Sequence, residues 1–227
     1  MVMKDRDTPA TRADRLAMVA SQIESRGIRD PLVVKAMREV PRHLFVPGDM
    51  QKRAHDDTPL PIGWEQTISQ PYIVAYMTQA LGLHGQETVL EIGCGSGYQA
   101  AILSRIAARV YTVERIPQLA RKAMATLDEL GITNIQVREG DGSLGWEEKS
   151  PFDAIMVTAS GPRIPAPLSS QLGLHGTLVM PVGSRGQGQR IVRQTRISRE
   201  TFRTDQLLGV AFVPLIGEYG WRADRKG

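Results

Sequence analysis

Apolar residues follow two different rhythms along the chain. Up to about residue 87 they recur every three or four positions, which is the spacing of helices that bury one face. This spacing predicts three helices, at residues 9–26, 31–40 and 71–81. The predicted apolar faces are Leu16, Val19 and Ile23 in the first helix; Leu32, Val33, Ala36, Met37 and Val40 in the second; and Ile73, Tyr76, Met77, Ala80 and Leu81 in the third.

Proline and small polar residues mark where these helices begin. Thr8-Pro9 and Asp30-Pro31 are each a capping residue followed by proline, and Ser69 is the expected cap of the third helix, two residues before Pro71. Gly27, Pro41 and Gly82 are the expected stops. The stretch 41–66, rich in proline, glycine and charge, is predicted to be an irregular connection.

From Thr88 onward, short β-type runs alternate with helical patterns. Strands are predicted at 88–92, 110–113, 135–138, 152–157 and 177–180, and helices at 98–107, 117–130 and 167–172. Such alternation is typical of a mostly parallel, doubly wound α/β sheet. Two later runs, 190–197 and 207–213, have no helix between them and are expected to close the sheet with an antiparallel edge.

A glycine-rich loop joins the first of these strands to its helix. Gly93, Gly95 and Gly97 alternate with other residues directly after Ile92 and before Tyr98. Residues without a side chain let the backbone turn sharply and approach a ligand, and the helix start offers free N–H groups. Coming between strand and helix, the loop indicates a nucleotide-type site at the switch point of the sheet.

Acidic residues follow the next two strands. Glu114 ends one, and Asp141-Gly142 follows the other. The glycine spacing, with Glu91 before it, resembles the motif of Rossmann-like methyltransferases, which use S-adenosyl-L-methionine and release S-adenosyl-L-homocysteine. The resemblance implies that Glu91, the three glycines and Gly142 belong to the cofactor site. It also implies that Glu114 binds the ribose hydroxyls and that Asp141 contacts the adenine amino group.

Composition narrows the classes of protein. The 227 residues with 41% hydrophobic content suit one compact domain. We expect a disordered tail at 1–8, a helical and substrate-binding segment at 9–87, the sheet core at 88–217 and a C-terminal tail at 218–227. Scattered histidines and the single Cys94 give no metal-ligand spacing, and Cys94 is interpreted as a packing residue. A cytoplasmic location is expected, with no metal and no membrane.

The segment before the sheet carries a more specific resemblance. Residues 61–63 (Pro-Ile-Gly) and 66–75 (Gln-Thr-Ile-Ser-Gln-Pro-Tyr-Ile-Val-Ala) resemble the protein-L-isoaspartate O-methyltransferase family. The similarity continues through 89–98, 113–115, 140–142, 151–155, 181–183 and 212–215, so that it covers about residues 16 to 217. The family implies a monomeric enzyme that methylates the free α-carboxylate of L-isoaspartyl residues in damaged proteins and peptides, which starts their repair through a succinimide.

The family resemblance also implies roles for particular residues. Ser69 takes the position usually assigned to the active site, with Thr67 and Ile68 helping to form the substrate pocket. Val213 and Pro214, in the stretch Phe212–Leu215, would line its other wall. Because a carboxylate is already ionised at neutral pH, the reaction needs no strong general base. Ser69 is therefore expected to position the substrate and not to act as a nucleophile.

Other classes of protein remain as alternatives. A nucleic-acid methyltransferase would share the cofactor loop, and the net charge of +4 is compatible with it. The sequence 158–162 (Thr-Ala-Ser-Gly-Pro) lacks the Asp/Asn-Pro-Pro-aromatic loop of base-amine methylation, which argues against that class. A nicotinamide oxidoreductase is disfavoured by the glycine spacing. A protein that only binds the nucleoside as a sensor is the non-enzymatic alternative.

Overall fold

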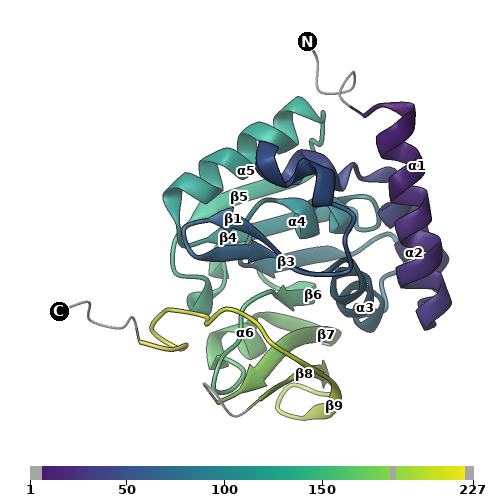
Figure 1. The fold of residues 1–227 in the computed structure, drawn as a ribbon. Helices are drawn as coiled ribbons and strands as arrows, with labels where there is room; N and C mark the ends of the chain where they lie inside the picture. The colour runs from purple at the N-terminus through teal and green to yellow at the C-terminus, as the bar shows by residue number, and fades with distance from the viewer. Residues whose placement is uncertain (1–6, 185–187, 223–227) are drawn as a thin grey trace.

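A computed structural model describes residues 7–184 and 188–222, and its centre is a twisted seven-stranded sheet (Figure 1). The strand order is β5-β4-β3-β6-β7-β8-β9, parallel from β5 to β7 and antiparallel through β8 and β9. The strands are β3 (Thr88–Ile92), β4 (Arg109–Glu114), β5 (Ile135–Glu139), β6 (Phe152–Val157), β7 (Leu172–Gly183), β8 (Gln189–Arg196) and β9 (Phe202–Val210). The predicted sheet, including its antiparallel edge, is confirmed.

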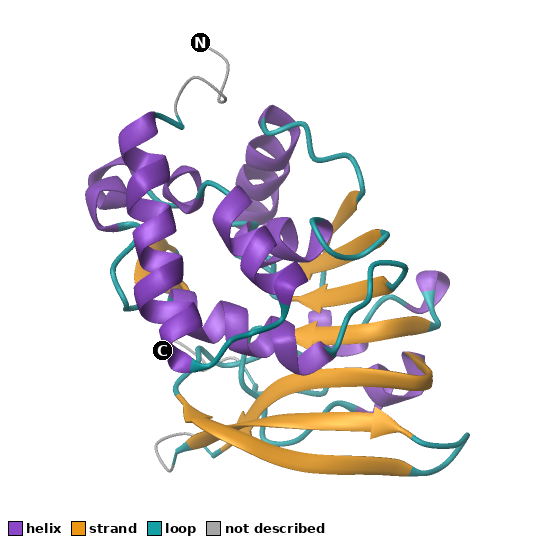
Figure 2. Ribbon diagram, turned by 90° about the vertical axis from the view of Figure 1, so that its right-hand side faces the viewer, coloured by secondary structure: helices purple, strands orange, loops and turns teal. Residues whose placement is uncertain are grey.

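Two apolar cores lie on opposite faces of this sheet. One face packs against α4 (Tyr98–Ser104), α5 (Pro117–Glu129) and the N-terminal helices. The other is covered by α6 (Ala166–Gln171) and by 3-10 turns near Trp146. Figure 2 shows the longer helices gathered on one side of the strands. The central strands β3 and β6 are buried on both faces, which explains why most of their residues are apolar.

The N-terminal helices begin as predicted. Thr8 caps α1 (Pro9–Met18), which continues through a π turn (Val19–Ile23) and a 3-10 turn (Glu24–Arg26) before Gly27 ends it at φ +88°. Asp30 caps α2 (Pro31–Glu39). The predicted burial of Leu16 is wrong: it is 42% exposed, whereas Met18, Val19 and Ile23 form the buried face. The extra residue in the π turn changes which side chains face the core.

Helix α3 (Pro71–Leu81) shows a second departure from the prediction. Its N-cap is Gln70, with no side-chain capping bond, so the assignment of Ser69 as the cap is wrong. The fully buried side is formed by Val74, Ala75, Met77, Thr78 and Leu81, and the predicted face members Ile73, Tyr76 and Ala80 are only partly buried. The position of Ser69 one residue earlier leaves its hydroxyl group available for another partner.

The stretch 41–66 is more regular than predicted. It contains two 3-10 helices (Arg42–Phe45 and Gly48–Arg53) and begins an antiparallel hairpin of β1 (Leu60–Gly63) and β2 (Gln66–Ile68). At the chain ends, Asp7 pairs with Arg15, and a bridge joins Ile216 to Trp221. The remainder of the predicted tails, residues 1–6 and 223–227, lies outside the described residues. None of the helices in the described ranges is both long and apolar enough to cross a membrane.

Candidate active site

The glycine loop lies at the carboxyl ends of β3, β4 and β6, where the order of connections along the sheet reverses. Gly93 has φ +94°, and a Cβ built on it would lie 2.5 Å from Thr158 Oγ1, so the close approach of these two segments requires glycine. Gly95 has φ +54° and faces the hairpin, with Ile62 Cδ1 3.3 Å from its built Cβ. Gly97 packs against Ala123 of α5 and lines no cavity near the loop.

Two cavities meet at this loop. The loop cavity, of about 70 Å³, is lined by Gly93, Gly95, Glu114, Gly142 and Pro214 among others. The segment cavity, of about 470 Å³, is lined by Ser69, Gln70, Ile73 and Phe212 among others. Thr67, Thr158 and Val213 line both cavities, and a smaller space of about 40 Å³ between them touches Ile68 and Ser69. The predicted cofactor and substrate residues are therefore adjacent, although Pro214 lies on the loop-cavity side.

The carboxylate of Glu114 ties the loop to the next strand. Glu114 Oε2 accepts the Gly95 N–H at 2.8 Å, and its Oε1 accepts the Ile116 N–H at 2.8 Å. The side chain is 6% exposed but lines the loop cavity. Each oxygen keeps a second lone pair, so the carboxylate can accept further hydrogen bonds from a ligand in the cavity.

Asp141 is enclosed by the C-terminal end of the described chain. Its Oδ1 accepts from the N–H and the hydroxyl of Ser143, and its Oδ2 accepts the Glu218 N–H at 2.8 Å. A Cβ on Gly217 would lie 2.1 Å from Asp141 Oδ1, so this contact requires glycine. Asp141 itself does not line the loop cavity, whereas Gly142 does. The predicted C-terminal tail thus begins as a turn that packs on an acid of the candidate site.

Glu91 lies behind the loop and not in the cavity. It is fully buried, Thr112 Oγ1 donates to its Oε2 at 2.5 Å, and its Oε1 has no partner among the described residues. Burial, opposed by the Thr112 hydrogen bond, raises the pKa of Glu91 to about 8. The structure therefore places this predicted cofactor residue in the core, hydrogen-bonded to Thr112 of the neighbouring strand β4.

Thr158 is a site residue that the sequence analysis did not assign. It follows β6, and its hydroxyl donates to the Gly93 carbonyl at 2.6 Å. Its contact with both cavities places it at their junction. The only signal in the sequence is its position at the end of a parallel strand next to the switch point, where ligand contacts concentrate.

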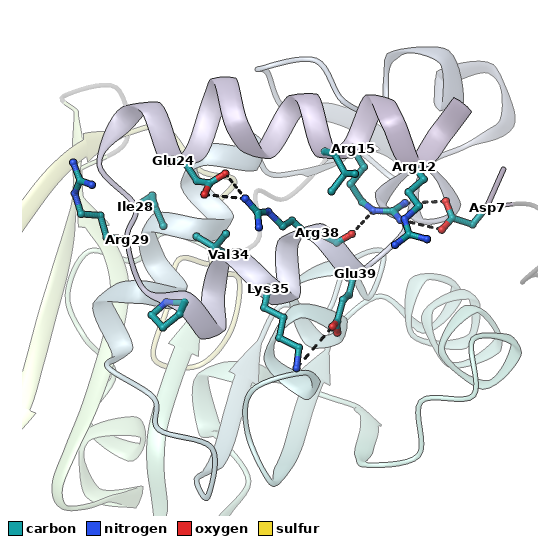
Figure 3. Close-up of a pocket in the computed structure, with 12 residues that line it drawn as sticks. Asp7, Arg12, Arg15, Glu24, Ile28, Arg29, Val34, Lys35, Arg38 and Glu39 are labelled. Atoms are coloured by element: carbon teal, nitrogen blue, oxygen red, sulfur yellow. Dashed lines mark hydrogen bonds and ion pairs between the residues drawn. The ribbon is translucent and has the colours of Figure 1, made fainter. Parts of the chain in front are cut away.

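A wider groove of about 740 Å³ lies elsewhere, between α1 and α2 (Figure 3). Its charged groups largely neutralise one another, in the ion pairs Arg15–Asp7, Arg38–Glu24 and Lys35–Glu39. It shares no residue with the loop or segment cavity. We therefore assign it no part in the chemistry.

No group of three or more potential metal ligands occurs within residues 7–184 and 188–222. Cys94 is buried inside the glycine loop, and burial raises the pKa of its thiol well above the ordinary value. A protonated, buried thiol is a poor nucleophile, which agrees with its interpretation as a packing residue.

The sheet order, the glycine loop at the switch point and the strand-end acid Glu114 define the class: a Rossmann-like, S-adenosylmethionine-dependent methyltransferase. The model of the protein-L-isoaspartate(D-aspartate) O-methyltransferase family matches residues 13–220. The chain belongs to this family.

Relatives and solved structures agree with this assignment. Protein-L-isoaspartate O-methyltransferase 1 of Rhodopseudomonas palustris is 57% identical, over 96% of this chain and 92% of the relative. The Methanoregula boonei protein-L-isoaspartate O-methyltransferase is 54% identical, over 94% of this chain and 98% of the relative. A solved protein-L-isoaspartate O-methyltransferase has a TM-score of 0.82 at 27% identity, covering 92% of this chain and 67% of that one. A solved Plasmodium falciparum structure, described as a putative protein-L-isoaspartate O-methyltransferase, contains S-adenosyl-L-homocysteine. Its TM-score is 0.78 at 25% identity, covering 89% of this chain and 98% of that one.

Proposed function

We propose that this chain performs its family's reaction by holding two oppositely charged partners in adjoining cavities. The reaction is methyl transfer from S-adenosyl-L-methionine to the free α-carboxylate of an L-isoaspartyl residue, the first step of repair. The observation that supports this most strongly is the junction itself, where Thr67, Thr158 and Val213 line both cavities. A donor and an acceptor held on either side of these residues would meet there.

The residues of the loop cavity suit the cofactor. When bound, S-adenosylmethionine supplies an electrophilic methyl group on a positively charged sulfur. Glu114 offers carboxylate lone pairs for ribose hydroxyls, and Gly93, Gly95 and Gly142 allow close approach to the backbone. Small-molecule pockets commonly measure ~300–1,000 Å³, so the cofactor needs more space than the loop cavity of about 70 Å³ offers by itself.

The substrate side supplies positioning and not proton transfer. Ser69 is only partly buried, lines the segment cavity, and makes no hydrogen bond through its hydroxyl within the described residues. We assign it to the acceptor carboxylate, with Thr67, Ile68 and Val213 as walls of the substrate pocket. The acceptor is already ionised near pH 7 because its reference pKa is about 4. Correct alignment can then contribute up to about 7–11 kcal/mol to lowering the barrier in the most favourable intramolecular cases.

We also propose that the partners are isoaspartyl proteins and peptides, with no nucleic acid or membrane, and that the chain acts as a cytoplasmic monomer. Several C-terminal arginines are engaged within the sheet: Arg193 pairs with Asp205, and Arg196 donates to the Leu172 carbonyl. These two side chains therefore have partners within the sheet, which makes them less available to bind phosphates. Light scattering of the purified chain tests the oligomeric state.

One assay separates the proposed function from its alternatives. Labelled S-adenosylmethionine is supplied with an isoaspartyl peptide, its normal aspartyl twin, RNA or DNA. We expect base-labile label on the isoaspartyl peptide alone. Transfer to nucleic acid alone, or cofactor binding without any transfer, would overturn the proposal.

A further inference from the structure

Arg42 is a buried cation behind the substrate segment, outside both cavities. Its side chain is 0% exposed. Nε donates to the Ala54 carbonyl and Nη2 to the Ser69 carbonyl, each at 2.7 Å. The guanidinium carbon lies 4.8 Å from the centre of the Tyr98 ring, at the start of α4. Arg42 thus joins the segment that carries Ser69 to the helix that follows the glycine loop.

The charge of Arg42 has no counter-ion among the described residues. Its Nη1 also lacks a hydrogen-bond partner there. Arg15 is a useful contrast, since it is equally buried at 2% exposure but pairs with both carboxylate oxygens of Asp7. Burying an unpaired cation is costly, and an arginine cannot escape the cost by losing its proton. A cost of this kind is often found where a charge serves a ligand.

The hydrogen bond to Ser69 fixes the direction of a peptide group. In a trans peptide the N–H points opposite to the carbonyl, so the Gln70 N–H points away from Arg42. That N–H donates to no described residue, and neither does the Ser69 hydroxyl. Both residues line the segment cavity, at the N-terminus of the eleven-residue helix α3. Pro71 next to them has no N–H, and the Tyr72 and Ile73 N–H groups of the same first turn likewise have no hydrogen bond within the described residues, so the helix start offers several unused donors beside the Ser69 hydroxyl.

We propose that Arg42 is a positioning residue for the acceptor carboxylate, an inference that rests on the proposed function. It holds the Ser69–Gln70 peptide so that the Ser69 hydroxyl and the Gln70 N–H face the segment cavity. Its unpaired positive charge, transmitted through this polarised peptide, favours an ionised acceptor over a neutral one. The isoaspartyl α-carboxylate then supplies the negative charge that Arg42 lacks.

The test compares two peptides that differ only in charge: an isoaspartyl peptide with its free α-carboxylate and the same peptide as the α-carboxamide. Binding to the S-adenosylhomocysteine-loaded chain is measured by calorimetry for wild type, Arg42→Met, Arg42→Lys and the matched control Arg15→Met. We expect Arg42→Met to lower the carboxylate-to-carboxamide affinity ratio about tenfold or more, with S-adenosylhomocysteine affinity kept within about threefold. A role in packing alone would weaken both peptides equally.

The affinity ratios of the variants separate a positioning role of Arg42 from a role in packing. An unchanged ratio in Arg42→Met, or an equal fall in Arg15→Met, would overturn the inference. If Arg42→Met does not fold, Arg42→Lys decides. It keeps the charge but not the two-carbonyl geometry, so we expect the ratio to be kept and kcat to fall about tenfold; wild-type kcat would overturn the inference. A wild-type chain that neither binds nor methylates the isoaspartyl peptide would overturn the proposed function as well.

Discussion

The two sides of the junction are built from opposite charges. On the loop-cavity side, Glu114 and Asp141 accept hydrogen bonds from backbone N–H groups of the segments they hold. On the segment-cavity side, Arg42 donates to backbone carbonyls. The sulfonium cofactor is positively charged at its reacting end and the acceptor is an anion. In the proposed arrangement, each ligand binds on a side whose fixed charge is opposite to its own, and the charged side chains are hydrogen-bonded to the main chain next to the cavity.

Not every acid near the glycine loop carries a negative charge. Burial raises the pKa of Glu91 to about 8, so we expect Glu91 to be protonated at neutral pH. Its folded pKa of about 8 lies above the ordinary 4.5. Its contribution to stability is therefore complete below pH 4.5 and is lost as the pH rises to about 8. Relative to Glu91→Gln, the unfolding free energy of the wild type should fall by up to about 1.4 kcal/mol per pH unit in this window.

Urea unfolding at several pH values measures this difference. Glu139→Gln is the control, because Glu139 also belongs to a parallel strand but its side chain is 41% exposed. A gap between wild type and Glu91→Gln that stays constant from pH 5 to pH 8 would show that Glu91 is ionised in the folded chain.

Glu114→Gln is the sharpest probe of the loop-cavity side. An amide cannot accept both the Gly95 and the Ile116 N–H groups, and hydrogen bonds to charged groups are worth ~1.5–3 kcal/mol. We expect S-adenosylhomocysteine affinity to fall about 10- to 100-fold, with the KM for the isoaspartyl peptide unchanged at saturating cofactor. A raised KM for the peptide with normal cofactor affinity would show that Glu114 serves the substrate and not the cofactor.

Gly217→Ala tests whether the C-terminal turn supports Asp141, which we propose contacts the cofactor. The new Cβ would lie 2.1 Å from Asp141 Oδ1 and 2.6 Å from Ser143 Oγ, so the turn must move and the Glu218 N–H contact must weaken. Overpacking of this kind costs ~1–3 kcal/mol, and we expect cofactor affinity to fall about tenfold. Gly140→Ala is the matched control, because its Cβ would meet nothing within 4 Å. Equal behaviour of the two variants would rule out the supporting role.

Ser69→Ala should have the smallest effect. A net hydrogen bond is worth ~0.5–1.5 kcal/mol, so turnover on the isoaspartyl peptide should fall about 2- to 10-fold while S-adenosylhomocysteine affinity stays at the wild-type value. Steady-state kinetics and calorimetry on one preparation measure both. An equal loss of cofactor affinity would mean that Ser69 belongs to the loop-cavity side.

The parallel sheet could be predicted from the sequence because its strands are short and apolar, and glycines and prolines mark their ends. The hairpin around Trp64 and Glu65 could not, because its strands span only four and three residues. Its turn also has positive φ at two residues that rarely adopt it. The cap of α3 was misplaced by one residue because Ser69 looks like a better cap than Gln70.

Some residues of the candidate site could be predicted from the sequence, and others are brought to the site only by the tertiary fold. Gly93, Gly95 and Glu114 could be found because loop and strand-end positions are visible in the linear pattern. Arg42 could not, because an arginine in a proline-rich stretch is typical of the surface and only the tertiary fold buries it. Thr158 likewise acquires its place at the junction only when β6 packs beside β3.

A crossed binding measurement tests the central claim most directly. S-adenosylhomocysteine and, on the loaded chain, the isoaspartyl peptide are titrated into Asp141→Asn and Arg42→Met. The two-sided account predicts that Asp141→Asn loses cofactor affinity and, once saturated, binds the peptide normally, while Arg42→Met binds the cofactor normally and loses the peptide. Loss of both ligands in both variants would contradict it.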